Sequence, residues 1–192
     1  MAELVDALDW KSSSGNGVWV RFPLWVQSVF KMYTKKKQNR YDQAYMKMAI
    51  EWSKLSHCTR KKVGALIVKD NMIISDGYNG TPSGFENKCE LPNKETKWYV
   101  LHAEANAILK CAKYGQSCHN ASLYLTLSPC KECSKLIHQS GIKKVIFHKK
   151  YKDTSGIDFL KKAGVEILQL SKLNNTIWPK MLIHLFQDHY GL

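Results

Sequence analysis

The sequence has no apolar run long enough to cross a membrane. Its most apolar early stretch, Val18–Phe30, is interrupted by Arg21 and Pro23, whereas a transmembrane helix needs roughly 20 apolar residues. The first residues are acidic where a secretory signal is basic. Internal repeats and Gly-X-Y periods are also absent, which excludes repeat and collagen-like architectures. We therefore expect a chain with no membrane partner and a cytoplasmic location.

Acidic residues are scarce relative to basic ones. The 192 residues include 16 Asp and Glu against 29 Lys and Arg, which gives a formal net charge of +13. The first 31 residues are charge-balanced, so the whole excess lies in residues 32–192. Such an excess favours an anionic partner, and composition does not choose among nucleic acid, a membrane surface and a phosphorylated small molecule. The 44% hydrophobic content is enough for one buried core.

The composition changes near residue 32. Residues 1–31 contain a flexible Ser/Gly/Asn stretch and no clean periodicity, and we hypothesise that they are an extension upstream of a start at Met32. The Lys-rich residues 32–39 predict a basic tether. Residues 40–172 then predict one domain, and residues 173–192 a C-terminal helical tail.

From residue 40 onward, helical and strand periods alternate along the chain. Helices are expected at 41–56, 103–113, 130–139 and 156–163, and strands at 63–69, 72–78, 122–127, 144–148 and 165–170. Asp70-Asn71 predicts a hairpin turn, and residues 79–99 a long loop of the kind that often carries function. The pattern predicts an α/β fold in which helices cover a central sheet.

The cysteines indicate a metal before a disulfide, because a chain of this size in a reducing compartment does not need cross-links. Cys130 and Cys133 follow Pro129, where a helix is expected to begin. Their spacing places both thiols on one helix face, near the helix N-terminus, which lowers thiol pKa values. No second Cys-x-x-Cys completes a structural zinc site.

His102, expected at the start of the preceding helix, is the candidate third ligand. Three protein ligands and one open position describe a catalytic zinc rather than a structural one. Glu104, two residues further on, is the candidate general acid and base, because a carboxylate near a zinc-activated water can take up and deliver its proton.

His102-x-Glu104 followed by Pro129-Cys130-x-x-Cys133 resembles the signature of the zinc-dependent nucleobase deaminases. Within that group the chain resembles the deoxycytidylate (dCMP) deaminase family, over the stretches 63–69, 74–85, 102–108, 126–130 and 140–147. The resemblance covers roughly residues 40–170. It implies a three-layer α/β/α cytidine-deaminase-like fold with a central mixed sheet of about five strands.

The resemblance also implies a mechanism. Zinc on His102, Cys130 and Cys133 would activate water for attack on C4 of cytosine, while Glu104 delivers protons to N3 and to the departing amino group. The substrate dCMP would give dUMP, which feeds thymidylate synthesis, and ammonia. A homo-oligomer is implied as well, with dCTP and dTTP as candidate allosteric effectors.

Further candidate residues lie outside the zinc motif. By resemblance, Asn79 is the candidate for contact with the sugar, although a tight turn explains it equally well. Arg60 and Lys61 are candidates for reading the phosphate, and a solvated strand edge explains them equally well. Cys58 and Cys89 are candidates for a second, structural zinc, as in some phage members of the family, but further ligands are not obvious.

Other functions share parts of this pattern. A tRNA adenosine deaminase has the same zinc signature, and the positive charge would suit RNA. A free cytidine deaminase would usually be less basic, and a zinc-stabilised nucleic-acid-binding module would close the fourth zinc position and leave Glu104 unused. The loop Gly77–Gly84 and the stretch Leu127–Cys130 favour the nucleotide enzyme. We therefore expect dCMP, not nucleic acid, as the partner.

Overall fold

The computed structural model describes residues 9–11, 19–21 and 24–173. The chain divides into two compact units, residues 1–42 and 43–192. This boundary falls near residue 40, where the sequence predicts the main domain to begin. The expected C-terminal tail lies outside the described residues, except for Leu173.

The first unit holds a strand pair and the beginning of a long helix. Strand β1 (Asp9–Lys11) pairs antiparallel with β2 (Trp19–Arg21). Helix α2 (Leu24–Ser53) begins far before the expected residue 41 and includes residues 32–39, which were expected to form a tether. Side chains from 28 to 41 are exposed, and an exposed helix needs no apolar period. The apolar periodicity of the sequence therefore marks only the buried part of α2, and it does not show where the helix begins. A start at Met32 stays a prediction.

A mixed five-stranded sheet forms the centre of the second unit, in the order β4-β3-β5-β6-β7. The strands are β3 (Gly64–Lys69), β4 (Met72–Tyr78), β5 (Ser122–Leu127), β6 (Lys144–Lys149) and β7 (Glu166–Gln169). Strand β3 is antiparallel to β4 and β5, whereas β5, β6 and β7 are parallel. The expected hairpin turn is confirmed, with positive φ at Asp70 (50°) and Asn71 (61°).

Helices cover both faces of this sheet. One face packs against α3 (Ala103–Lys113), α4 (Lys131–Gln139) and α5 (Ser155–Lys162), around buried side chains such as Leu123 and Leu125. The other face packs against the end of α2 through Met46 and Ala49. The expected three-layer α/β/α architecture is confirmed. No helix in the described part of the chain is long and apolar enough to cross a membrane.

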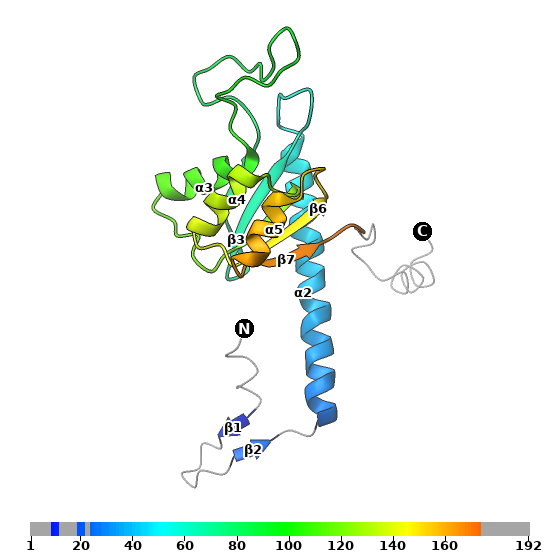
Figure 1. The fold of residues 1–192 in the computed structure, drawn as a ribbon. Helices are drawn as coiled ribbons and strands as arrows, with labels where there is room; N and C mark the ends of the chain where they lie inside the picture. Colours follow the sequence, from blue (N-terminus) through cyan, green and yellow to red (C-terminus); the bar gives the residue numbers. More distant parts are fainter. Residues whose placement is uncertain (1–8, 12–18, 22–23, 174–192) are drawn as a thin grey trace, which may run out of the picture. The chain divides into compact units, whose positions relative to one another are not determined.

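Two connecting segments gather at one end of the sheet. Residues 54–63 lead from α2 into β3, and residues 79–102 lead from β4 into α3. Figure 1 shows both segments projecting at the same end. The longer loop folds back on itself through isolated bridges between Gly80 and Leu101 and between Glu90 and Thr96. These segments lie beside the N-terminus of α3, so they can wall a site there.

Gly77 allows α3 to lie directly against β4. A Cβ at this position would meet the carbonyl oxygen of Ala103 and lie 2.8 Å from the backbone nitrogen of Ala107. Both are backbone atoms of α3, so only a displacement of the helix would make room. The position of this helix, which begins directly after His102, therefore depends on the absence of a side chain at residue 77.

We expect Gly77→Ala to lower the free energy of unfolding by about 1–3 kcal/mol, the usual cost of overpacking. Chemical denaturation measures this directly. Gly80→Ala is the matched control, because its Cβ would meet nothing nearer than the Tyr78 ring at 3.9 Å. That variant should remain within about 0.5 kcal/mol of the wild type. Equal stability of both variants would contradict the close approach of α3 to β4.

Candidate active site

Two helix N-termini meet at the site. His102 has extended backbone angles (φ −75°, ψ 155°) directly before α3, and Cys130 has similar angles (φ −75°, ψ 169°) directly before α4. Cys133 lies in the first turn of α4. The three side chains are therefore positioned by the starts of two regular helices rather than by a loose loop.

These side chains converge as a metal site requires. The Nδ1 atom of His102 lies 3.6 Å from the Sγ atom of Cys130 and 3.3 Å from that of Cys133. The three candidate ligand atoms all lie within 4.8 Å of one another, the one such cluster among the described residues. Imidazole nitrogen and thiolate sulfur are the donors that zinc prefers. The donor set thus fits zinc, as the sequence predicts.

The two thiols are electrostatically unequal. Hydrogen bonds from Cys133 and His102 lower the pKa of Cys130 to about 3. The pKa of Cys133 is raised, first by its hydrogen bond to Cys130 and then by burial. The hydrogen bond to Cys130 also raises the pKa of His102, with help from the charge of Glu104. The three side chains of the cluster thus share protons through their hydrogen bonds. A bound divalent metal ion would displace these protons, because ligands bind metal in their deprotonated forms.

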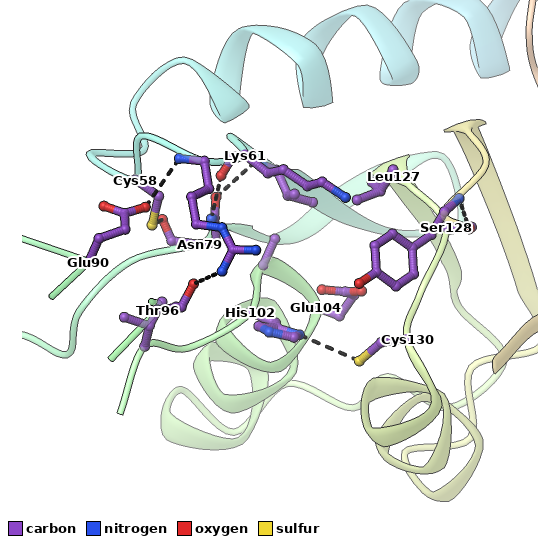
Figure 2. A pocket seen from close by; sticks show the side chains of 15 residues that line it. Cys58, Lys61, Asn79, Glu90, Thr96, His102, Glu104, Leu127, Ser128 and Cys130 are labelled. Carbon is purple, nitrogen blue, oxygen red and sulfur yellow. Dashed lines mark hydrogen bonds between the residues drawn. The ribbon is translucent and has the colours of Figure 1, made fainter. Parts of the chain in front are cut away.

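Glu104 lies in the first turn of α3 and is only 4% exposed. Burial raises the pKa of its carboxyl group, and the nearby His102 opposes that rise. A carboxyl group that keeps its proton more readily than in water is suited to proton transfer near neutral pH. Figure 2 shows Glu104 beside His102 and Cys130.

A cavity of about 250 Å³ opens over the cluster. His102, Glu104 and Cys130 all line it, which leaves the open side of the cluster facing the cavity. Its volume lies just below the usual range for small-molecule sites, about 300 to 1,000 Å³. The arrangement is a three-ligand metal site with an adjacent acid and room for a small substrate.

The structure brings Asn79, Arg60 and Lys61 to the same cavity. The side-chain oxygen of Asn79 accepts a hydrogen bond from the N–H of Val63 (2.8 Å), and its amide nitrogen donates to the carbonyl of Lys61 (2.8 Å). Asn79 therefore fixes the backbone that carries these cations. A contact between Asn79 and a sugar stays a prediction.

The sequence analysis missed other residues of the cavity wall, among them Ser128 and Tyr151. The N–H of Tyr151 donates to the hydroxyl of Ser128 (2.8 Å), and the Lys61 Nζ atom lies 4.3 Å from the centre of the Tyr151 ring. Both residues follow the carboxyl ends of the parallel strands β5 and β6, where ligands bind in α/β sheets. That topological position is the signal that identifies them.

Cys58 and Cys89 form a disulfide with each other. This corrects the expectation of a metal before a disulfide at these two cysteines, and with it their interpretation as ligands of a second zinc, because bonded sulfurs cannot bind as thiolates. The physical reason is long-range contact: the N–H groups of Thr59 and Arg60 donate to the Glu90 carboxylate, which places the adjacent Cys89 beside the segment before β3.

Comparison with known sequences agrees with the interpretation of the cluster as a zinc site. The family model described as "Cytidine and deoxycytidylate deaminase zinc-binding region" matches residues 39–149. The chain is 37% identical to the deoxycytidylate deaminase of Enterobacteria phage T4, covering 67% of this chain and 90% of that relative. It is 41% identical to the deoxycytidylate deaminase of Pongo abelii, covering 62% of this chain and 72% of that relative.

A solved structure is also similar. The dCMP deaminase from the cyanophage S-TIM5, in complex with dCMP and dUMP, is 49% identical with a TM-score of 0.65. The similarity covers 66% of this chain and 94% of that one. All four residues of the predicted zinc motif lie within the region that matches the family model.

We expect one zinc ion per purified chain, because the described residues contain one suitable cluster. Cys130→Ala should lose the metal, since two remaining ligands hold zinc far more weakly than three. Elemental analysis of the purified proteins provides the measurement. Cys118→Ala, which removes a buried cysteine outside the cluster, should retain one zinc. Full zinc in Cys130→Ala would refute the assignment of that ligand.

Proposed function

Because the chain belongs to the cytidine and deoxycytidylate deaminase family, we propose that it is a zinc-dependent hydrolase that converts dCMP to dUMP. The central observation is a buried acid, Glu104, beside a His-Cys-Cys cluster in one small cavity. In the reaction, water adds its oxygen to C4 of the cytosine ring, and the C4–N bond breaks to release ammonia. The S-TIM5 relative, solved with dCMP and dUMP, supports this choice of substrate.

The proton transfers belong to Glu104. Zinc held by His102, Cys130 and Cys133 supplies, when bound, the acidity that makes water a nucleophile at neutral pH. The Glu104 carboxylate takes up the proton of that water and delivers it to N3 of the ring. The same carboxylate then takes the remaining proton from the oxygen added at C4 and delivers it to the departing amino nitrogen, so that C4 becomes a carbonyl as the C4–N bond breaks. Burial supports this role, because it raises the proton affinity of the carboxylate.

The phosphate of dCMP is assigned to Arg60 and Lys61. Neither side chain forms an ion pair with a carboxylate within the described residues. Both line the cavity, so a phosphate there would meet two cationic side chains that can donate charge-assisted hydrogen bonds to it. Asn79, which also lines the cavity, is assigned to the sugar.

Other features implied by the family resemblance stay predictions. These are the homo-oligomer, the effectors dCTP and dTTP, and the cytoplasmic location. The nucleic-acid-binding alternative requires a fourth protein ligand on the zinc and no use for Glu104. The three-ligand cluster and the buried acid on the cavity wall favour the enzyme instead.

Ammonia release from a panel of substrates tests the proposed function. We expect turnover of dCMP and little from dCTP, cytidine or a tRNA anticodon stem, because the cavity suits one nucleotide and its cations suit one phosphate. Turnover of the RNA alone would indicate an RNA deaminase. Release from none of the substrates by the zinc-loaded protein would refute the enzyme.

Glu104→Gln should keep one zinc per chain and lose activity by a factor of about 10²–10⁴, the usual contribution of general acid–base catalysis. The amide is similar in size but cannot carry the proton. Steady-state kinetics with dCMP and zinc analysis of the same preparation provide the two measurements. Glu132→Gln, which changes an exposed carboxylate on α4, should retain wild-type activity. Near-normal turnover by Glu104→Gln would remove the assigned role.

A further inference from the structure

The segment 58–61 is fastened to the loop 89–97 by side chains. The disulfide joins Cys58 to Cys89. Next to it, the Glu90 Oε1 atom accepts hydrogen bonds from the backbone N–H groups of Thr59 (2.9 Å) and Arg60 (3.2 Å). The Arg60 guanidinium in turn donates to the Thr96 hydroxyl (3.3 Å). We call this set of contacts the wall junction.

The other end of the same segment is held by Asn79, through the backbone of Lys61 and Val63. The backbone that carries Arg60 and Lys61 is therefore held by hydrogen bonds at both ends, to the Glu90 carboxylate at one end and to the Asn79 amide at the other. A backbone fixed at both ends limits the directions that the two side chains can take. Both side chains line the cavity.

The Glu90 carboxylate is engaged rather than free. Desolvation acts to raise its pKa, but hydrogen bonds from the backbone N–H groups of Arg60 and Thr59 hold the pKa below its usual value. One carboxylate oxygen accepting two backbone N–H groups is a charge-assisted arrangement, stronger than a neutral one. No other side chain in the described residues is hydrogen-bonded to these two backbone N–H groups.

The wall junction lies away from the reacting groups. Figure 2 shows Glu90 and Thr96 on the opposite side of the cavity from Glu104 and Cys130. Arg60 and Lys61 come from the segment that Glu90 holds, and they are the cations assigned above to the phosphate. A change at Glu90 therefore acts on the segment that carries both cations and leaves in place the helix N-termini that carry Glu104 and Cys130.

We infer that Glu90 is a positioning residue for phosphate recognition: it fixes the backbone of Thr59 and Arg60 so that Arg60 and Lys61 face the phosphate of the substrate. The inference rests on the proposed function. It gives a loop carboxylate, which is itself an anion, a role in the binding of an anionic nucleotide. Glu90 also lines the cavity, and the inference assigns its effect to the backbone of the segment that it holds.

Kinetics of the zinc-loaded protein with dCMP and with deoxycytidine, which lacks the phosphate, test the inference. Glu90→Ala should raise KM for dCMP about tenfold, as expected for loss of a charged hydrogen-bond acceptor, with kcat within about twofold. Catalytic efficiency with deoxycytidine should not change. Glu90→Gln, which keeps a carbonyl oxygen as acceptor, should recover part of the loss. The dissociation constant of the product dUMP should follow KM.

The matched control is Glu95→Ala, which removes an exposed carboxylate from the same loop and should leave all constants unchanged. Lys61→Met provides a second comparison. If Glu90 acts through the cation segment, adding Glu90→Ala to Lys61→Met should raise KM by less than about threefold, because the two changes are not independent.

The outcomes separate the two claims. A wild-type protein without dCMP turnover refutes the proposed function and this inference with it. If the wild type is active, an unchanged KM in Glu90→Ala overturns the inference alone. Equal losses with dCMP and deoxycytidine also overturn it, because they indicate general damage to the fold. New activity on dCTP with unchanged KM for dCMP overturns it too, and makes Glu90 a group that repels longer phosphates.

Discussion

The meeting of two helix N-termini is the constraint on which the rest of this structure depends. Helix α3 follows the loop after β4, helix α4 follows β5 directly, and β3 lies between these strands in the sheet. Because Gly77 lets α3 lie against β4, His102 reaches within 3.6 Å of Cys130. A displacement of either helix by one turn, about 5.4 Å, would separate the ligands. The sheet order and the packing of one glycine therefore set the geometry of the metal site.

The meeting of the two helix N-termini also explains why Glu104 is buried and why its pKa is raised. The carboxyl group belongs to the second residue of α3, directly after the completely buried Ala103, and it is itself almost fully shielded from water. Two thiolates at the cluster would offset the charge of a zinc ion, which weakens the attraction that would otherwise keep Glu104 ionised. Burial is the largest influence on the pKa of Glu104 and raises it. Ligand type and burial together give the acid a proton affinity suited to transfer in both directions.

Local patterns predicted much of this architecture, and long-range contacts account for what they missed. Helix α3, strands β4 and β5 and the zinc motif follow from periodicity and spacing within short stretches. The early start of α2 does not, because its exposed residues show no apolar stripe. The Cys58–Cys89 bond and the hydrogen bonds of Glu90 join residues about thirty positions apart in sequence, and one sequence contains no spacing rule for such pairs. Tyr151 is identifiable only once β5 and β6 are known to be parallel neighbours.

Only a small part of the net charge of +13 lies at the cavity. A nucleotide monophosphate carries about two negative charges at neutral pH, and two cations, Arg60 and Lys61, line the cavity. Exposed lysines elsewhere raise the potential around the protein and can speed the approach of an anion, but salt screens them over about 10 Å. Recognition requires cations held at the right place, and a flexible lysine or arginine is held only if its backbone is. In this chain the Glu90 carboxylate and the Asn79 amide hold the backbone of the segment that carries Arg60 and Lys61, so an acidic side chain helps to fix the position of two cations.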